Sequence, residues 1–108
     1  MVCLIENVED FEAKLKQAGD KLVVLDFFAE WCPPCNKIGP KFVELSKKYT
    51  NVIFYKVDVD DAADVAEKCS VESMPTFIFF KNGQQVDKVV GGGEETENKL
   101  ETIIKKLS

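Results

Sequence analysis

Apolar residues along this chain follow two different periods, and each period predicts one type of element. Short apolar runs predict strands at Val2–Glu6, Leu22–Ala29, Val52–Val57, Thr76–Lys81 and Gln85–Val90. Apolar residues at helical spacing predict helices between Asn7 and Gly19, from after Cys35 to about Tyr49, from about Ala62 to Cys69, and at Glu94–Leu107.

This order of elements predicts one α/β domain over residues 1–108, built on a mixed sheet. Helices that follow the early strands require parallel crossovers, whereas Asn82-Gly83 between the last two strands is a strong signal for an antiparallel hairpin. Leu22–Ala29 is apolar on both faces, which is typical of a central strand covered by helices on each side. Pro40 lies inside the second predicted helix and is expected to kink it.

Composition and charge exclude several classes of protein. With 108 residues, 45% of them apolar, the chain is long enough to bury a core without disulfide staples. The net charge of −5 argues against a general nucleic-acid-binding protein, which normally carries a basic stripe. No apolar run approaches the roughly 18 residues that a membrane span needs. The first residues lack a basic segment followed by a long apolar one, so we expect a cytoplasmic protein without a secretory signal.

The segment Trp31-Cys32-Pro33-Pro34-Cys35 carries the clearest chemical signal. Two thiols at this spacing can close a disulfide, and a helix N-terminus favours the thiolate, which is the attacking form. Pro33 and Pro34 suit the first helical positions, where a backbone N–H would lack a partner. We therefore expect a dithiol–disulfide exchange centre, with Cys32 as the exposed attacking thiol and Cys35 as the shielded thiol that resolves the mixed disulfide.

The other cysteines leave one alternative, in which the motif is half of a zinc site. Its second half would have to be Cys3 and Cys69, which have no paired spacing. The chain has no histidine, so a proton acceptor must be a carboxylate, a lysine, a thiol or water. We expect no metal. Cys3 and Cys69 are interpreted as small buried apolar residues, with a regulatory role as the second interpretation for Cys69.

Asp26 is the second chemical signal, because it lies amid apolar residues on the strand that leads to Cys32. Burial of a carboxylate raises its pKa, which suits a proton acceptor for Cys35 during the attack on a mixed disulfide. The alternative is a structural carboxylate paired with Lys56 on the next strand.

Two further positions stay open from the residues alone. Trp31 is either a core aromatic residue or a surface residue beside the reactive thiol. The Met74-Pro75 bond precedes a strand, and an ordinary trans turn is the default for such a bond.

Several segments together resemble the thioredoxin family over essentially the whole chain. They are Lys21–Asp26, Phe27–Cys32, Asn51–Asp61, Met74–Phe77 and Phe80–Gly83.

The resemblance implies a thioredoxin fold, with a five-stranded mixed sheet flanked by four helices. It implies that Cys32 is the nucleophile, Cys35 the resolving thiol and Asp26 the buried acid. It also implies that Pro75 is a cis-proline facing the dithiol and that the Thr76 backbone pairs with a bound substrate strand. The docking groove would be lined by Trp31, Met74, Pro75, Gly91 and Gly92.

The resemblance also implies an activity and partners. The expected activity is protein-disulfide reduction by a monomer that binds no cofactor and takes electrons from NADPH through thioredoxin reductase. The expected clients are proteins such as peroxiredoxins, methionine sulfoxide reductase and ribonucleotide reductase. The alternatives are an oxidase, an isomerase or a nucleoredoxin-like protein, or a binding module that uses the fold without turnover.

Three positions depart from the family pattern: Pro33 replaces a glycine, Asn36 a lysine and Ser73 a cysteine. Pro33 removes an N–H near the Cys32 sulfur and stiffens the loop, and these two effects need not change the redox potential in the same direction. We expect Pro33, Pro34 and Lys56 to tune the exchange, with a moderate change of potential inside the reducing range.

Overall fold

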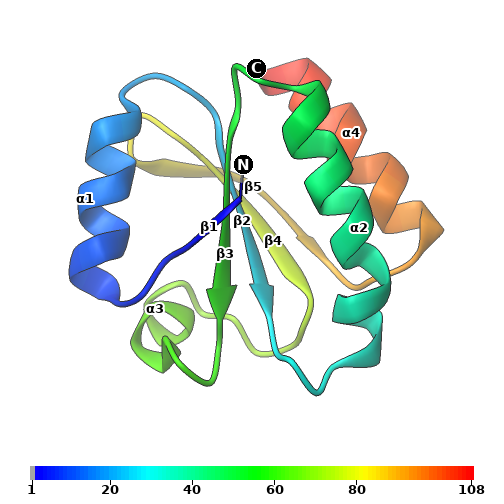
Figure 1. Ribbon diagram of the computed structural model, residues 1–108. Helices are drawn as coiled ribbons and strands as arrows, with labels where there is room; N and C mark the ends of the chain where they lie inside the picture. The colour runs from blue at the N-terminus through cyan, green and yellow to red at the C-terminus, as the bar shows by residue number, and fades with distance from the viewer. Residues whose placement is uncertain (1) are drawn as a thin grey trace.

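Residues 2–108 of the computed structural model form a five-stranded sheet and four helices (Figure 1). The strands are β1 (Cys3–Leu4), β2 (Val23–Phe28), β3 (Ile53–Asp58), β4 (Thr76–Lys81) and β5 (Gln84–Val90). The helices are α1 (Val8–Ala18), α2 (Pro33–Lys48), α3 (Ala63–Lys68) and α4 (Glu94–Leu107). The predicted order of elements is confirmed, and most boundaries differ from the expectation by one or two residues.

The strand order is β1-β3-β2-β4-β5, which makes the sheet mixed. Strands β1, β3 and β2 run parallel, and β4 is antiparallel to both β2 and β5. The predicted hairpin is present: Asn82 and Gly83 have φ of 55° and 77° between β4 and β5. Positive φ at both turn residues is the conformation that two-residue hairpin turns favour.

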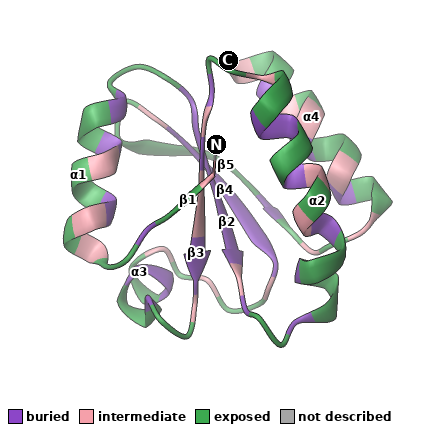
Figure 2. Ribbon diagram, viewed as in Figure 1, coloured by how far each residue is buried: buried purple, intermediate pink, exposed green. Residues whose placement is uncertain are grey.

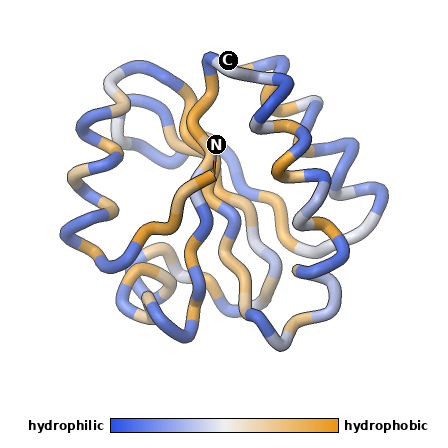
Figure 3. The backbone as a smooth tube through the Cα atoms, in the orientation of Figure 1, coloured by the Kyte–Doolittle hydropathy of each residue, from blue (hydrophilic) through white to orange (hydrophobic). Residues whose placement is uncertain are grey.

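Each face of the sheet is covered by two helices, α1 and α3 on one side and α2 and α4 on the other (Figure 1). Successive side chains of a strand point to opposite faces, so β2 supplies both cores. Its Leu25 packs with the α1 and α3 side, and its Val24 packs with the α2 and α4 side. The central strands are accordingly buried (Figure 2), and apolar residues concentrate in the sheet and on the inner sides of the helices (Figure 3).

The helix ends follow the signals in the sequence. The Asn7 side chain accepts a hydrogen bond from the Asp10 N–H at 2.8 Å, and Gly19 ends α1 with φ of 61°. Helix α2 begins directly after Cys32 and continues through Pro40 to Lys48. No helix within residues 2–108 combines the length and the apolar character needed to span a bilayer.

The first strand differs from the prediction. It covers only Cys3–Leu4 and pairs with β3 alone, at the edge of the sheet. Both of its side chains are exposed, so the expectation that Cys3 is a buried apolar residue is wrong. A two-residue edge strand has a neighbour on one side only, which leaves its side chains less covered than those of a central strand.

We predict that Phe77→Ala lowers the free energy of unfolding by about 3–5 kcal/mol, because Phe77 on β4 is fully buried and its ring packs against Phe42. Denaturant unfolding measures this change. The matched control is Val86→Ala on β5, whose side chain is exposed, with an expected change within about 0.5 kcal/mol. Equal losses for the two variants would contradict the assignment of the core.

Candidate active site

Cys32 and Cys35 form a disulfide at the N-terminus of α2, where the chain leaves the carboxyl end of β2. Their Cα atoms lie 5.3 Å apart, one turn of chain from each other. Cys32 is the N-cap residue, with an extended backbone, and Pro33 and Pro34 occupy the first two helical positions. The sulfur of Cys32, which the sequence predicts to be the attacking one, therefore lies at the positive end of the helix dipole.

One backbone donor serves the Cys32 sulfur within this turn. The Cys35 N–H donates to Cys32 Sγ at 3.3 Å. Pro33 and Pro34 have no N–H, so the donor arrives only at the third residue of the helix. The two prolines thus restrict the local hydrogen bonding of the sulfur.

The expected difference in exposure between the two cysteines is wrong. Cys32 and Cys35 are each only 4% exposed. They pack with Ala29, and the half-buried side chains of Phe28 and Met74 cover the same cluster. Cys32 is shielded because segments far away in the sequence converge on it, which its position after a strand does not reveal.

The segment around Pro75 lies directly beside the disulfide. The Met74-Pro75 bond is cis, as the family resemblance implied and the local default did not. The Met74 carbonyl oxygen lies 3.7 Å from Cys32 Sγ. Next in the chain, Thr76 is buried and its hydroxyl donates to the Ser73 carbonyl at 2.6 Å.

The loop between β5 and α4 closes the other side of the site. The Gly91 N–H donates to the Pro75 carbonyl at 2.9 Å. A Cβ added at Gly92 would lie 3.0 Å from the Pro34 carbonyl oxygen and 3.1 Å from the Pro34 Cβ, so the close approach requires glycine. A shallow cleft of about 320 Å³ lies here, lined by Pro33, Pro34, Lys37, Gly92 and Gly93.

Trp31 is a surface residue, which resolves the two interpretations of its role. Its side chain is 67% exposed, and the indole N–H donates to Asp60 Oδ2 at 3.0 Å. Asp60 follows the end of β3, and its own N–H donates to the Asp58 carboxylate. The sequence analysis did not predict the contact between Asp60 and Trp31. A signal was present, because both residues follow the carboxyl ends of parallel strands.

Asp26 is buried on β2 with an exposed fraction of 1%, and its Oδ1 has no hydrogen-bond partner among residues 2–108. Burial raises its pKa from 3.8 to about 7, and the nearby charge of Lys56 opposes part of this rise. Lys56 is the register partner of Asp26 on β3, yet no ion pair joins the two side chains in the described part of the chain. The alternative of a structural ion pair therefore finds no support in the structure.

Comparisons with known proteins agree with this arrangement. The thioredoxin family model matches residues 2–106. The chain belongs to the thioredoxin family. It is 60% identical to the thioredoxin of Ictalurus punctatus over 98 residues, which cover 89% of this chain and 92% of the relative. It is 54% identical to the thioredoxin of Homo sapiens over 107 residues, which cover 99% of each chain.

Solved structures give the same result for the fold. The Fasciola hepatica thioredoxin matches with a TM-score of 0.92 at 40% identity, covering 97% of this chain and 98% of that chain. The reduced Schistosoma mansoni thioredoxin pre-protein matches with a TM-score of 0.91 at 47% identity, covering 99% and 98%. The expected thioredoxin fold is confirmed, and the Cys32–Cys35 disulfide identifies this thioredoxin-family chain as a thiol–disulfide oxidoreductase.

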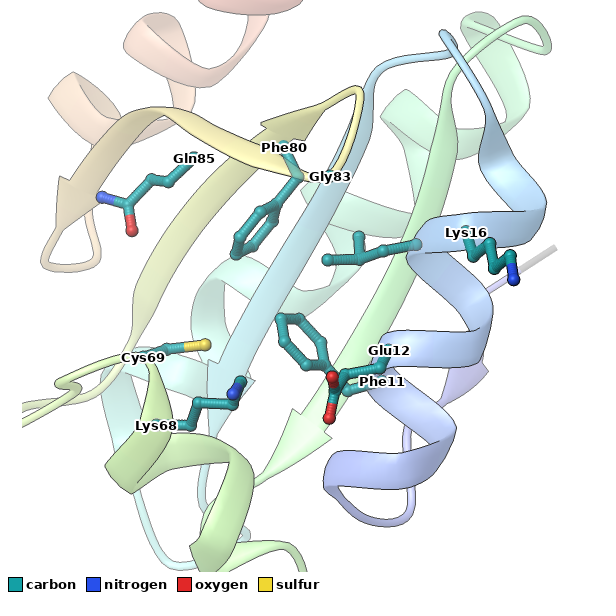
Figure 4. Close-up of a pocket in the computed structure, with 9 residues that line it drawn as sticks. Phe11, Glu12, Lys16, Lys68, Cys69, Phe80, Gly83 and Gln85 are labelled. Carbon is teal, nitrogen blue, oxygen red and sulfur yellow. The ribbon is translucent and has the colours of Figure 1, made fainter.

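The remaining cysteine, Cys69, belongs to another part of this thioredoxin-family fold. It is half-buried at the end of α3 and lines a cavity of about 390 Å³ between α1, α3 and the β4–β5 hairpin (Figure 4). Phe11, Leu15 and Phe80 form its apolar walls. Burial raises the pKa of the Cys69 thiol, which makes it less reactive. Within residues 2–108 no group of three or more His, Cys, Asp or Glu side chains is placed to hold a metal ion.

We predict that Asp26→Asn changes the pH dependence of folding. Because the native pKa of Asp26 is about 7 and its ordinary value is 3.8, the native state keeps a proton that the unfolded chain loses between these pH values. The stabilisation from Asp26 is therefore full below pH 4 and is lost as pH rises to 7, by about 4 kcal/mol at most.

Urea unfolding of both proteins at pH 4.5 and pH 8 measures this effect. The difference in unfolding free energy between Asp26→Asn and the unsubstituted protein should move in favour of the variant as pH rises. The control is Asp61→Asn, which makes the same substitution at an exposed position; a trend of the same size there would mean that the effect is not specific to Asp26. A difference that does not depend on pH would contradict the raised pKa of Asp26.

Proposed function

We propose that this thioredoxin-family protein is a protein-disulfide reductase that uses the Cys32–Cys35 dithiol. The observation that carries the proposal is the disulfide at the N-terminus of α2, with a buried carboxyl group of raised pKa on the strand that leads to it. The reduced form of such a pair supplies two electrons to a client disulfide.

In the first step the Cys32 thiolate attacks one sulfur of a client disulfide. A bond forms between Cys32 and that sulfur, the client S–S bond breaks, and the other client sulfur leaves as a thiolate that takes a proton from solvent. The helix dipole and the Cys35 N–H, which reaches Cys32 Sγ in the disulfide form, favour the attacking thiolate.

In the second step Cys35 resolves the mixed disulfide. Its thiol gives up a proton, which Asp26 accepts directly or through water, and its sulfur attacks Cys32. The Cys32–Cys35 bond forms as the bond to the client breaks, and the client sulfur leaves as a thiolate that takes a proton from solvent. The client is thereby reduced by two electrons and the dithiol is oxidised. A carboxyl group with a pKa of about 7 suits this transfer near neutral pH.

The residues around the disulfide would hold the client. Trp31 offers an exposed aromatic face, and the Met74, Pro75 and Thr76 segment lies beside Cys32. Gly91 and Gly92 lie nearby, where Gly91 donates to the Pro75 carbonyl and Gly92 packs closely against Pro34. We propose that an extended client segment lies along these residues, pairs with the Thr76 backbone and brings its disulfide to Cys32.

The wider setting follows from the family. We infer that electrons come from NADPH through thioredoxin reductase and that the protein binds no cofactor itself. Peroxiredoxins, methionine sulfoxide reductase and ribonucleotide reductase are the proposed clients, and a monomer in the cytoplasm is the proposed state. Cys69 stays a proposed regulatory position, and Lys56, Pro33 and Pro34 are proposed to tune the dithiol.

Insulin reduction tests the activity. With NADPH and thioredoxin reductase the protein should reduce insulin disulfides, and Cys35→Ser should abolish turnover while trapping a mixed disulfide between Cys32 and the client. Cys32→Ser is the matched control and should trap nothing. Retained client binding by a protein that lacks both thiols, together with no reduction by the unsubstituted protein, would instead indicate a binding module.

The potential of Pro33→Gly tests the role of Pro33. Thioredoxins have potentials of about −270 mV, and an N–H···S hydrogen bond of about 1 kcal/mol corresponds to about 20 mV. We expect the protein and its Pro33→Gly variant to differ by tens of millivolts and to stay in the reducing range. Equilibration with glutathione buffers measures both potentials. A value near the −120 mV of the oxidase DsbA would contradict the reductase assignment.

A further inference from the structure

The Lys56 side chain is held by an aromatic ring instead of the carboxylate beside it. Its ammonium group lies 4.3 Å from the centroid of the Phe28 ring, within the range of a cation–π contact. Asp26 is the strand neighbour of Lys56, yet its Oδ1 accepts no hydrogen bond from residues 2–108. A flexible lysine next to a buried, unpartnered carboxyl oxygen would ordinarily pair with it.

The three side chains share one face of the sheet. Asp26 and Phe28 are two residues apart on β2, so both point toward α2, as does Val24. Lys56 lies on the same face of β3, two residues after Phe54 of the α2-side core. The Phe28 ring packs at the edge of the cluster that contains Cys32 and Cys35. Phe28 therefore contacts both the lysine and the disulfide cluster.

We propose that Phe28 is a positioning residue for the exchange reaction: its ring holds the Lys56 ammonium group away from Asp26 and leaves the carboxyl group free to accept the Cys35 proton. This inference rests on the proposed role of Asp26 in the reductase. In a carboxylate paired with lysine the lone pairs are occupied and the pKa is low, which makes it a poor base.

The other titratable groups on this face of the sheet do not offer Asp26 a second positive charge. From β3, Asp58 also points toward α2, and its carboxylate accepts the N–H groups of Asp60 and Asp61 at 2.9 and 3.4 Å. From α2, Cys35 is titratable once the disulfide is reduced. The register partner of Asp26 on β4 is Phe77, which carries no charge. Lys56 is thus the one charged side chain of residues 2–108 whose effect on the pKa of Asp26 is resolved.

Phe28→Leu tests the contact, because it keeps an apolar side chain and removes the ring. Without the ring, Lys56 is free to approach Asp26. We expect the titration of the Asp26 carboxyl carbon, followed by NMR in the oxidised protein, to move to lower pH by about one pH unit. The acid limb of the pH–rate profile of insulin reduction should move in the same direction.

Two matched variants show whether the shift depends on the aromatic ring and on the Lys56 ammonium group. Phe28→Tyr keeps an aromatic face and should titrate as the unsubstituted protein does. Phe28→Leu made in a Lys56→Met background should cause no further downward shift, because the ammonium group is absent. If Phe28→Leu fails to fold, Phe28→Met serves in its place, since it also lacks a ring and fills space flexibly.

The proposal is overturned if Phe28→Leu leaves the Asp26 titration unchanged, or if the shift is the same with and without Lys56. The NMR titration tests the contact whether or not Asp26 acts in catalysis. A failure of the proposed function would give a different result. The acid limb of the pH–rate profile of insulin reduction would survive in Asp26→Asn, while Phe28→Leu would still shift the NMR titration of Asp26.

Discussion

The burial of β2 on both faces is the constraint on which the rest of the structure depends. Two helices on each side of the sheet require apolar side chains along this strand, and Asp26 is the exception among them. The same burial that makes a carboxylate costly there raises its pKa to about 7. The strand is followed closely by Cys32 at the start of α2. The packing of the sheet, the raised pKa of Asp26 and the position of the redox-active cysteines therefore all depend on β2.

Three segments that are distant in the sequence meet around the disulfide. The start of α2 contributes Pro34, the turn before β4 contributes Pro75, and the loop after β5 contributes Gly91 and Gly92. The Gly91 N–H donates to the Pro75 carbonyl, and Gly92 packs against the carbonyl oxygen and the Cβ of Pro34. Main-chain atoms together with the Pro34 side chain therefore hold these three segments close to the disulfide.

The sequence predicted those features that depend on local pattern. Alternating periods located the elements, Asn82-Gly83 located the hairpin, and an acidic residue within an apolar strand predicted the raised pKa of Asp26. It did not predict the burial of Cys32, the exposure of Cys3 or the Trp31–Asp60 hydrogen bond. Each of these depends on which distant segments pack together, and no local spacing encodes that. The cis bond at Pro75 came from the family resemblance alone.

The shielding of Cys32 limits the shape of what it can react with. Exchange requires a thiolate to approach a disulfide along the axis of the S–S bond. Cys32 is only 4% exposed in the disulfide form, and Met74 packs against the cluster that contains it, so little of this residue is accessible from solvent. A disulfide set flat in a rigid surface reaches so small an exposed area less readily than one on a protruding or locally unfolded strand. For the proposed reduction of protein disulfides, this shielding favours clients whose disulfide lies on a mobile segment.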